Sequence, residues 1–145
     1  MIKNGGKHMW IVFAALSAVF ASLTSILAKV GIEDVNSNLA TAIRTVTVTV
    51  MAWVIVIATG QVSGIQSITP KTWIFLGLSG IATGLSWLCY YRALQMADVS
   101  KVVPIDKLSI VITMFLAFLV LGEKANPKTI IGAVLITAGT FVMIL

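Results

Sequence analysis

The sequence predicts an all-α integral membrane protein with five transmembrane helices in a single domain, residues 1–145. Of the 145 residues, 59% are hydrophobic and only 10% are charged, whereas soluble proteins average roughly 45–50% apolar and about 25% charged residues. A helix crosses the hydrocarbon core with about 20 residues, so this length accommodates about five crossings. Five apolar runs define the spans, at about 9–28, 39–59, 72–94, 99–122 and 129–145.

The first two spans are assigned by their length. Twenty consecutive residues from Met9 to Ala28 carry no charge, too many for the 7–15-residue apolar region of a signal peptide. The second span contains an alternation of Thr and Val over residues 45–50 that is typical of a strand. Because an open sheet edge cannot satisfy its backbone groups in lipid, we expect this long apolar run to be helical.

Glycine and proline mark the remaining spans. A polar turn with Gly60, Gly64 and Pro70 precedes the third span. The uncharged run that begins at Leu108 is too short to cross the membrane, so the fourth span must include the preceding, more polar segment. That segment contains Pro104. Proline removes an i to i−4 hydrogen bond, so we expect a kinked helix or a helix start near Pro104. The fifth span begins after Pro127.

One stripe of the third span combines small and aromatic residues. Gly77, Gly80, Gly84, Trp87 and Tyr91 are spaced by 3, 4, 3 and 4 residues, which places them on one helical face. The glycines form a GxxxG pattern, which predicts close helix packing. The two aromatic residues fit either a cavity for an organic solute or a belt at the membrane interface.

Mildly polar residues also lie on single faces of the first and fourth spans. Ser17 and Thr24 share a face of the first span, and Asp106, Ser109 and Thr113 share a face of the fourth. A hydroxyl in a membrane helix most often bonds to a preceding carbonyl of its own helix. Taken with the third span, these faces predict a weakly polar cavity between spans one, three and four.

Six ionisable residues lie in or near the spans, all within about two turns of the same membrane face by helical rise: Lys29, Arg44, Arg92, Lys101, Asp106 and Lys107. One interpretation is that these side chains extend to the membrane surface. The other is a basic vestibule in which Arg44 and Lys107 favour a substrate with a carboxylate or another anionic group. Substituting either residue by Gln would separate the two interpretations.

Several function classes are not expected. The single histidine, His8, and the single cysteine, Cys89, predict neither a metal site nor a disulfide. We expect no enzyme and no cofactor, because paired central carboxylates and a nucleophile with a base are missing from the sequence. The basic residues are scattered singly, so we expect no nucleic-acid partner.

Flanking charge predicts the orientation. The N-terminal face carries five lysines, including Lys3 and Lys7, and the other face carries three to five cationic residues. This count favours a cytoplasmic N-terminus by the positive-inside rule, but the near balance also permits insertion in both orientations. Two identical antiparallel chains would reproduce the inverted repeats of secondary transporters.

Four groups of residues resemble the EamA family of the drug/metabolite transporter superfamily. They are Tyr90–Leu94, Val102–Ile105, Leu121–Glu123, and the pair Gly132 and Gly139 in the last helix. The resemblance covers the whole chain as one five-helix EamA-type repeat. It implies a carrier that exports small metabolites, amino acids among them, through a central cavity between two inverted repeats.

The resemblance also implies roles for particular residues. Trp87, Tyr91, Asp106 and Ser109 would face the cavity, and Glu123 would be a structural residue at a helix end. Because most members of the family have two repeats in one chain, a second chain would supply the missing repeat here. We therefore expect a homodimer in the lipid bilayer of the cell membrane that works by alternating access.

Two alternatives stay open. The chain could instead be a membrane subunit without transport activity that packs against a partner through Gly80 and Gly84 and through Gly132 and Gly139. Efflux of the small-multidrug type is less favoured, because the relatives with that activity carry a glutamate in their first span and residues 9–28 contain no acid.

Overall fold

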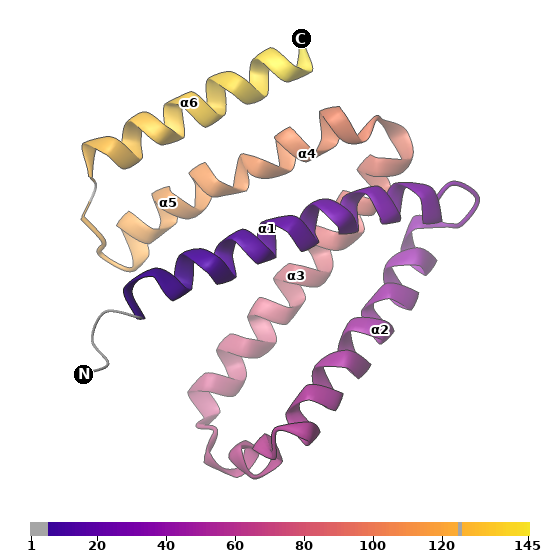
Figure 1. The fold of residues 1–145 in the computed structure, drawn as a ribbon, viewed down its shortest axis with the longest axis vertical. Coiled ribbons are helices and arrows are strands. Elements are labelled where there is room, and N and C mark those ends of the chain that lie inside the picture. Colours follow the sequence, from indigo (N-terminus) through magenta and orange to yellow (C-terminus); the bar gives the residue numbers. More distant parts are fainter. Residues whose placement is uncertain (1–5, 125) are drawn as a thin grey trace. The chain divides into compact units, whose positions relative to one another are not determined.

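The protein is a set of helices, and the computed structural model describes residues 6–124 and 126–145. Over these residues the elements contain no strand, and they are α1 (Gly6–Gly31), α2 (Ser37–Ala58), the 3₁₀ helix η1 (Gln61–Ser67), α3 (Pro70–Met96), α4 (Val99–Lys107), α5 (Ser109–Val120) and α6 (Pro127–Ile144) (Figure 1). Five segments of this part are long and apolar enough to cross a membrane, with α4 and α5 together forming one of them. The predicted all-α membrane fold with five spans is confirmed.

The observed spans differ from the predicted ones by a few residues. They run over Met9–Gly31, Ser37–Ala58, Pro70–Met96, Val99–Val120 and Pro127–Ile144. The first helix continues past Lys29 to Gly31. The Lys29 Nζ donates a hydrogen bond to the Ala97 carbonyl over 3.0 Å. Lys3, one of the charges behind the predicted orientation, lies outside the described residues.

The chain divides into two compact units, one formed by residues 31–96 and the other by residues 1–30 with 97–145. The first contains α2, η1 and α3, and the second contains α1, α4, α5 and α6. The assignment of residues 1–145 to a single domain stays a prediction.

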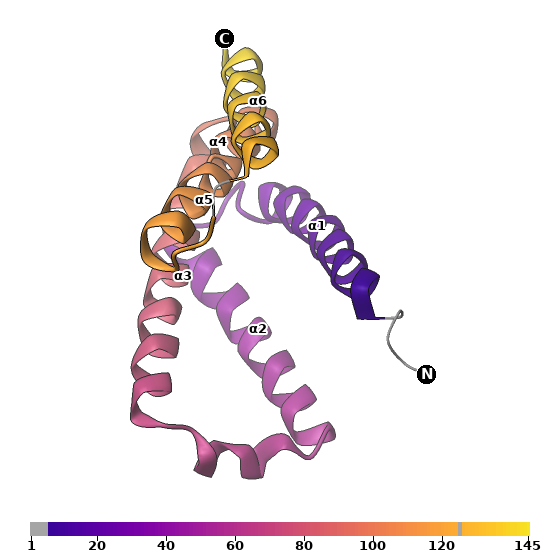
Figure 2. The same cartoon turned by 90° about the vertical axis from the view of Figure 1, so that its left-hand side faces the viewer.

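The unit of residues 31–96 is an antiparallel helical hairpin. Figures 1 and 2 show η1 joining α2 to α3 at one end of the hairpin, so the turn predicted between the two spans contains a 3₁₀ helix. Gly60 enters this turn with φ of +69°, a left-handed conformation that glycine adopts without strain. At the other end the helices pack together, and Thr41, Tyr91 and Leu94 are buried there.

Gln95 holds the segment that leads into α2. Its Nε2 donates to the carbonyls of Ile32, over 3.1 Å, and Val35, over 2.6 Å. Its Oε1 accepts a hydrogen bond from Arg92 over 3.3 Å. The following residue, Asn36, caps α2 by accepting from two backbone amides in its first turn. These bonds satisfy polar groups that the end of a helix leaves unpaired.

The second unit contains the irregular fourth span. Both α4 and α5 pack against α6, and Val102, Pro104 and Thr140 are buried. The helical segments meet at Leu108, four residues after the proline. The start of α6 is regular, because the Asn126 side chain caps it and a proline occupies its first turn.

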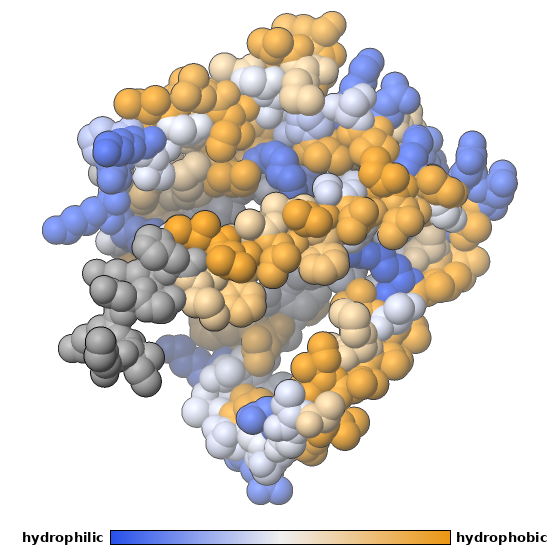
Figure 3. Space-filling view, viewed as in Figure 1, coloured by the Kyte–Doolittle hydropathy of each residue, from blue (hydrophilic) through white to orange (hydrophobic). Residues whose placement is uncertain are grey.

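Most large apolar side chains point outward rather than into a protein core. Figure 3 shows hydrophobic residues covering most of the helical surface that faces the viewer. Phe13 on α1, Trp73 on α3 and Leu119 on α5 are all exposed. A soluble monomer rarely exposes such large apolar patches, so this surface is suited to lipid hydrocarbon.

We predict that Gln95→Met destabilises the protein, because the Val35 carbonyl loses the side-chain donor and the Ile32 carbonyl keeps only the 3.5 Å bond from the Val35 amide. The expected loss is about 1–2 kcal/mol, measured as the free energy of unfolding in mixed micelles titrated with dodecyl sulfate. Gln66→Met is the matched control, since Gln66 is exposed on η1. Equal losses in the two variants would contradict this role for Gln95.

Candidate functional site

A cationic side chain lies against two aromatic rings inside the α2–α3 hairpin. The guanidinium carbon of Arg44 on α2 lies over the Trp87 ring of α3, 4.1 Å from its centroid. It lies 5.5 Å from the centroid of Tyr91. Trp87 and Tyr91 are one turn apart and share a helical face, so both rings turn toward the same cation. We call Arg44, Trp87 and Tyr91 the cation–aromatic cluster.

The position of the cluster along the hairpin argues against a side chain directed at the membrane surface. Arg44 is seven residues from Ser37, about 10.5 Å into α2 by helical rise. Trp87 is nine residues from Met96, about 13.5 Å into α3 from the same end of the hairpin. The Arg44 side chain therefore reaches a ring that is at least as deep as its own Cα. A side chain that extends to the membrane surface would point the other way.

Arg44 has no acidic partner in the part of the chain that the structure describes. The ion pair found there joins Lys107 and Asp106 on another helix. A cation–π contact contributes about 0.5–2 kcal/mol, less than the roughly 2.5–3.5 kcal/mol that an arginine costs at the centre of a spanning helix. The cluster thus stabilises the Arg44 charge in part and leaves guanidinium N–H groups for another acceptor.

Hydroxyl groups next to Arg44 along α2 donate their protons within their own helix. The Thr41 hydroxyl, one turn before Arg44, donates to the Ser37 carbonyl over 2.8 Å, and the Thr45 hydroxyl donates to the Thr41 carbonyl over 2.8 Å. Both therefore bond within their own helix, as the general habit of such residues predicts.

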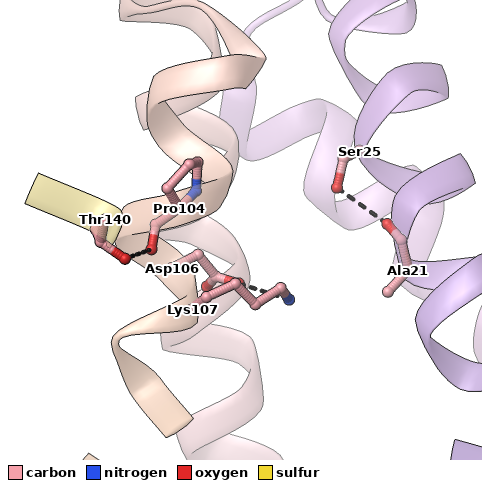
Figure 4. Close-up of polar contacts among 6 residues, drawn as sticks. All are labelled: Ala21, Ser25, Pro104, Asp106, Lys107 and Thr140. Atoms are coloured by element: carbon pink, nitrogen blue, oxygen red, sulfur yellow. Dashed lines mark hydrogen bonds and ion pairs between the residues drawn. The ribbon is translucent and has the colours of Figure 1, made fainter. Parts of the chain in front are cut away.

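The fourth span has a break in its hydrogen bonds at Leu108. The Leu108 amide donates to the Ile105 carbonyl over 3.0 Å, three residues back, instead of to Pro104. The Pro104 carbonyl accepts a hydrogen bond from the Thr140 hydroxyl of α6 over 3.3 Å (Figure 4). The prediction of a perturbed helix is confirmed, and the perturbation follows Pro104 by one turn. Thr140 was missed because nothing in its own sequence context points to a partner 36 residues away.

Polar side chains gather next to this break. Lys107 Nζ and an oxygen of Asp106 are 3.4 Å apart, and both side chains are partly exposed. Figure 4 shows this pair and, on α1, the Ser25 hydroxyl that donates to the Ala21 carbonyl over 3.0 Å. Since Lys107 has a carboxylate partner, its charge is neutralised locally.

The other predicted cavity residues are less confined. Ser17 on α1 and Ser109 and Thr113 on α5 are exposed, and Thr24 on α1 is half-buried. The cavity expected between spans one, three and four would join helices of both units and stays a prediction. The structure shows two groups of contacting residues. Arg44, Trp87 and Tyr91 form the cation–aromatic cluster in one unit, and Asp106 and Lys107 form an ion pair in the other.

The predicted packing glycines make no close contact within the described chain. A Cβ atom built on any of them would have no neighbour within 4 Å, and this holds for Gly77, Gly80, Gly84, Gly132 and Gly139. The described residues therefore show no close packing at these glycines, and their packing role stays a prediction.

An apolar groove of about 420 Å³ lies between α5 and α6. Its lining includes Phe115, Phe118 and Phe141. The Thr137 hydroxyl in this lining donates its proton to the Ala133 carbonyl over 2.9 Å, so it is not available as a donor to a polar ligand. The groove suits hydrocarbon.

Comparison with known proteins gives two matches. The EamA-like transporter family matches residues 8–145. The chain is also similar to an uncharacterized transporter encoded in the cobO 3' region of a Sinorhizobium species, with 48% identity over 137 residues, which are 94% of this chain and 97% of the relative. No solved structure matches the chain.

We predict that Thr140→Val lowers the free energy of unfolding by roughly 0.6–1.7 kcal/mol, the range for interhelical hydrogen bonds in membranes. The reason is that the Pro104 carbonyl loses the hydrogen bond from the Thr140 hydroxyl next to the helix break at Leu108. Thr137→Val is the control on the same helix, because the Thr137 hydroxyl bonds only one turn back in α6. Titration with dodecyl sulfate measures both variants. A larger loss for Thr137→Val would contradict the assignment.

Proposed function

Because the chain belongs to the EamA-like transporter family, we propose that it exports a small metabolite and that the cation–aromatic cluster binds this metabolite. At the level of the family, the chain is a multi-pass membrane protein of the drug/metabolite transporter type, and family membership points to transport rather than to catalysis. The direction, the substrate site and the mechanism are our proposals.

The contact of Arg44 with Trp87 and Tyr91 is the observation that carries the proposal. An ionisable residue inside a spanning helix is costly and most often marks a pathway for a substrate or ion. Flanking aromatic rings give such a site apolar walls beside a few polar groups, as small-molecule sites usually have. Tyr91 is buried and Trp87 is half-buried, so the rings form a partly enclosed surface rather than a belt exposed to lipid.

We propose that two copies form the transporter. Secondary transporters commonly bind substrate between two structural repeats, and this chain provides one repeat of five spans. The similar Sinorhizobium transporter aligns over 97% of its own length, so the two chains are nearly equal in length. A second identical chain would supply the other repeat. The glycines of α3 and α6, where an added Cβ would meet no atom of the described chain within 4 Å, offer surfaces for close helix contact.

Alternating access follows from such a pair. If the two copies insert in opposite orientations, they form inverted repeats around one site, and rocking of one against the other exposes the site to each face in turn. The nearly balanced flanking charge is compatible with both orientations. We propose that the pair lies in the cell membrane. In the copy whose orientation the flanking charge favours, we propose that the N-terminus is cytoplasmic.

Export is tested by untargeted mass spectrometry of the medium of cells that express the protein. We expect a defined set of small metabolites to accumulate outside cells with the natural protein. We expect Trp87→Ala to lower this accumulation roughly tenfold, the equivalent of about 1.4 kcal/mol of lost binding. Trp73→Ala is the control, because Trp73 is exposed on the same helix. A medium identical to that of cells without the protein, at equal membrane abundance of the protein, would favour the subunit without transport activity.

The dimer is tested by Gly80→Ile in lipid nanodiscs. A Cβ atom at this position would meet no atom within 4 Å in the described chain, so we expect the fold of one copy to tolerate the substitution. We expect the dissociation constant of the dimer to rise roughly tenfold, because a bulky residue separates the two backbones. Ala82→Ile on the opposite face of α3 is the control. Unchanged association in Gly80→Ile would exclude this face as the contact.

A further inference from the structure

Of the basic residues in or near the spans, Arg44 is singled out by its contacts. Lys29 donates to a backbone carbonyl, and Lys107 is paired with the adjacent carboxylate. Arg92 is exposed and bonds to a neighbouring side-chain amide. Lys101 is exposed in the first turn of α4. Arg44 alone among these lies on aromatic rings, and within the described residues it has no anionic partner.

We propose that the missing partner is a carboxylate of the transported metabolite, which binds the Arg44 guanidinium beside Trp87 and Tyr91. This inference rests on the proposed export function and narrows its substrate class to small organic acids with one carboxylate at the site. A guanidinium presents five N–H donors in a planar fork, which matches the two oxygens of a carboxylate. Binding would neutralise a charge that the aromatic contacts stabilise only in part.

The charge at the site favours a carboxylate over a phosphate. A phosphate monoester carries about −1.5 to −2 charges at neutral pH. One guanidinium would leave that charge partly uncompensated in a medium of low dielectric constant, which is costly. A single carboxylate carries one negative charge and matches the single positive charge of Arg44.

The same geometry disfavours a cationic substrate. Two aromatic rings side by side would otherwise suit an organic ammonium ion. The guanidinium already lies 4.1 Å from the centroid of Trp87, so a second cation would meet a like charge at close range. Trp87 and Tyr91 therefore act here as positioning residues that hold the arginine.

Trp87 also provides a direct measurement of binding. In a variant with Trp10, Trp53 and Trp73 replaced by phenylalanine, Trp87 is the remaining tryptophan. The three replaced side chains are all exposed, so the exchange of one apolar aromatic residue for another is expected to be tolerated. The emission of Trp87 then reports any ligand at the guanidinium that lies over its ring.

The probes are straight-chain monocarboxylates from acetate to octanoate, each with its amide, its primary amine and its alkyl phosphate of the same chain length. In nanodiscs, we expect at least one carboxylate to change the Trp87 emission saturably. The amide of the same chain length should need a roughly 10- to 100-fold higher concentration for half of the emission change, because a charge-assisted hydrogen bond is lost. No saturable response to any carboxylate, or equal or tighter binding of the matching amide, amine or phosphate, would overturn the inference.

Substitutions at Arg44 separate charge from geometry. Arg44→Gln should abolish the difference between carboxylate and amide, and Arg44→Lys should reduce it, because a lysine ammonium lacks the planar fork. Lys101→Gln removes one positive charge from α4, outside the α2–α3 hairpin, and should leave the difference unchanged. A difference that persists in both Arg44 variants would contradict binding at Arg44. The emission maximum of each variant without ligand shows whether the hairpin still encloses Trp87.

The export measurement on whole cells distinguishes failure of this inference from failure of the proposed function. Exported metabolites that consistently carry a carboxylate support both the carboxylate site at Arg44 and the export function. Exported metabolites without a carboxylate overturn the inference and leave the export function standing. Saturable carboxylate binding without any export supports the site and overturns the export function.

Discussion

The structure depends on the absence of water in the hydrocarbon core, because every backbone N–H and C=O group there needs a partner within the protein. Helices meet this requirement along their length, and their ends need additional partners. Asn36 and Asn126 cap two helix starts, and Gln95 binds two carbonyls before α2. The break at Leu108 follows the same rule, since the Thr140 hydroxyl occupies the Pro104 carbonyl.

The same constraint applies to charge and explains why the two charged clusters differ. Asp106 and Lys107 lie next to a helix break and neutralise each other over 3.4 Å. Arg44 lies in an unbroken helix, and the rings of Trp87 and Tyr91 provide its stabilisation within the described chain. The ion pair balances its own two charges, whereas the cation on aromatic rings keeps its net positive charge and its N–H donors for a ligand.

The sequence predicted what length and periodicity determine. The five spans follow from apolar runs of about 20 residues, and the shared face of Trp87 and Tyr91 follows from their spacing of four. The contact of Arg44 with those rings could not be predicted, because it depends on the register between α2 and α3 and on the Arg44 rotamer. Thr140 could not be predicted either, because a hydroxyl in an apolar helix most often bonds within its own helix. The helix-packing glycines and the cavity between spans stay predictions.

The placement of glycines and aromatic residues along α3 separates two tasks within one helix. Toward Met96, the face that carries Trp87 and Tyr91 packs against α2 and holds Arg44. Toward Pro70, a Cβ atom built at Gly77 or Gly80 would have no neighbour within 4 Å in the described chain. Glycine lowers helix stability in water and has no side chain to pack, so its repetition here fits our proposal that another backbone approaches closely. An arrangement in which one half of a helix holds a cation and the other half receives a second chain would couple substrate binding to the contact between copies. Such coupling is what alternating access between two repeats requires.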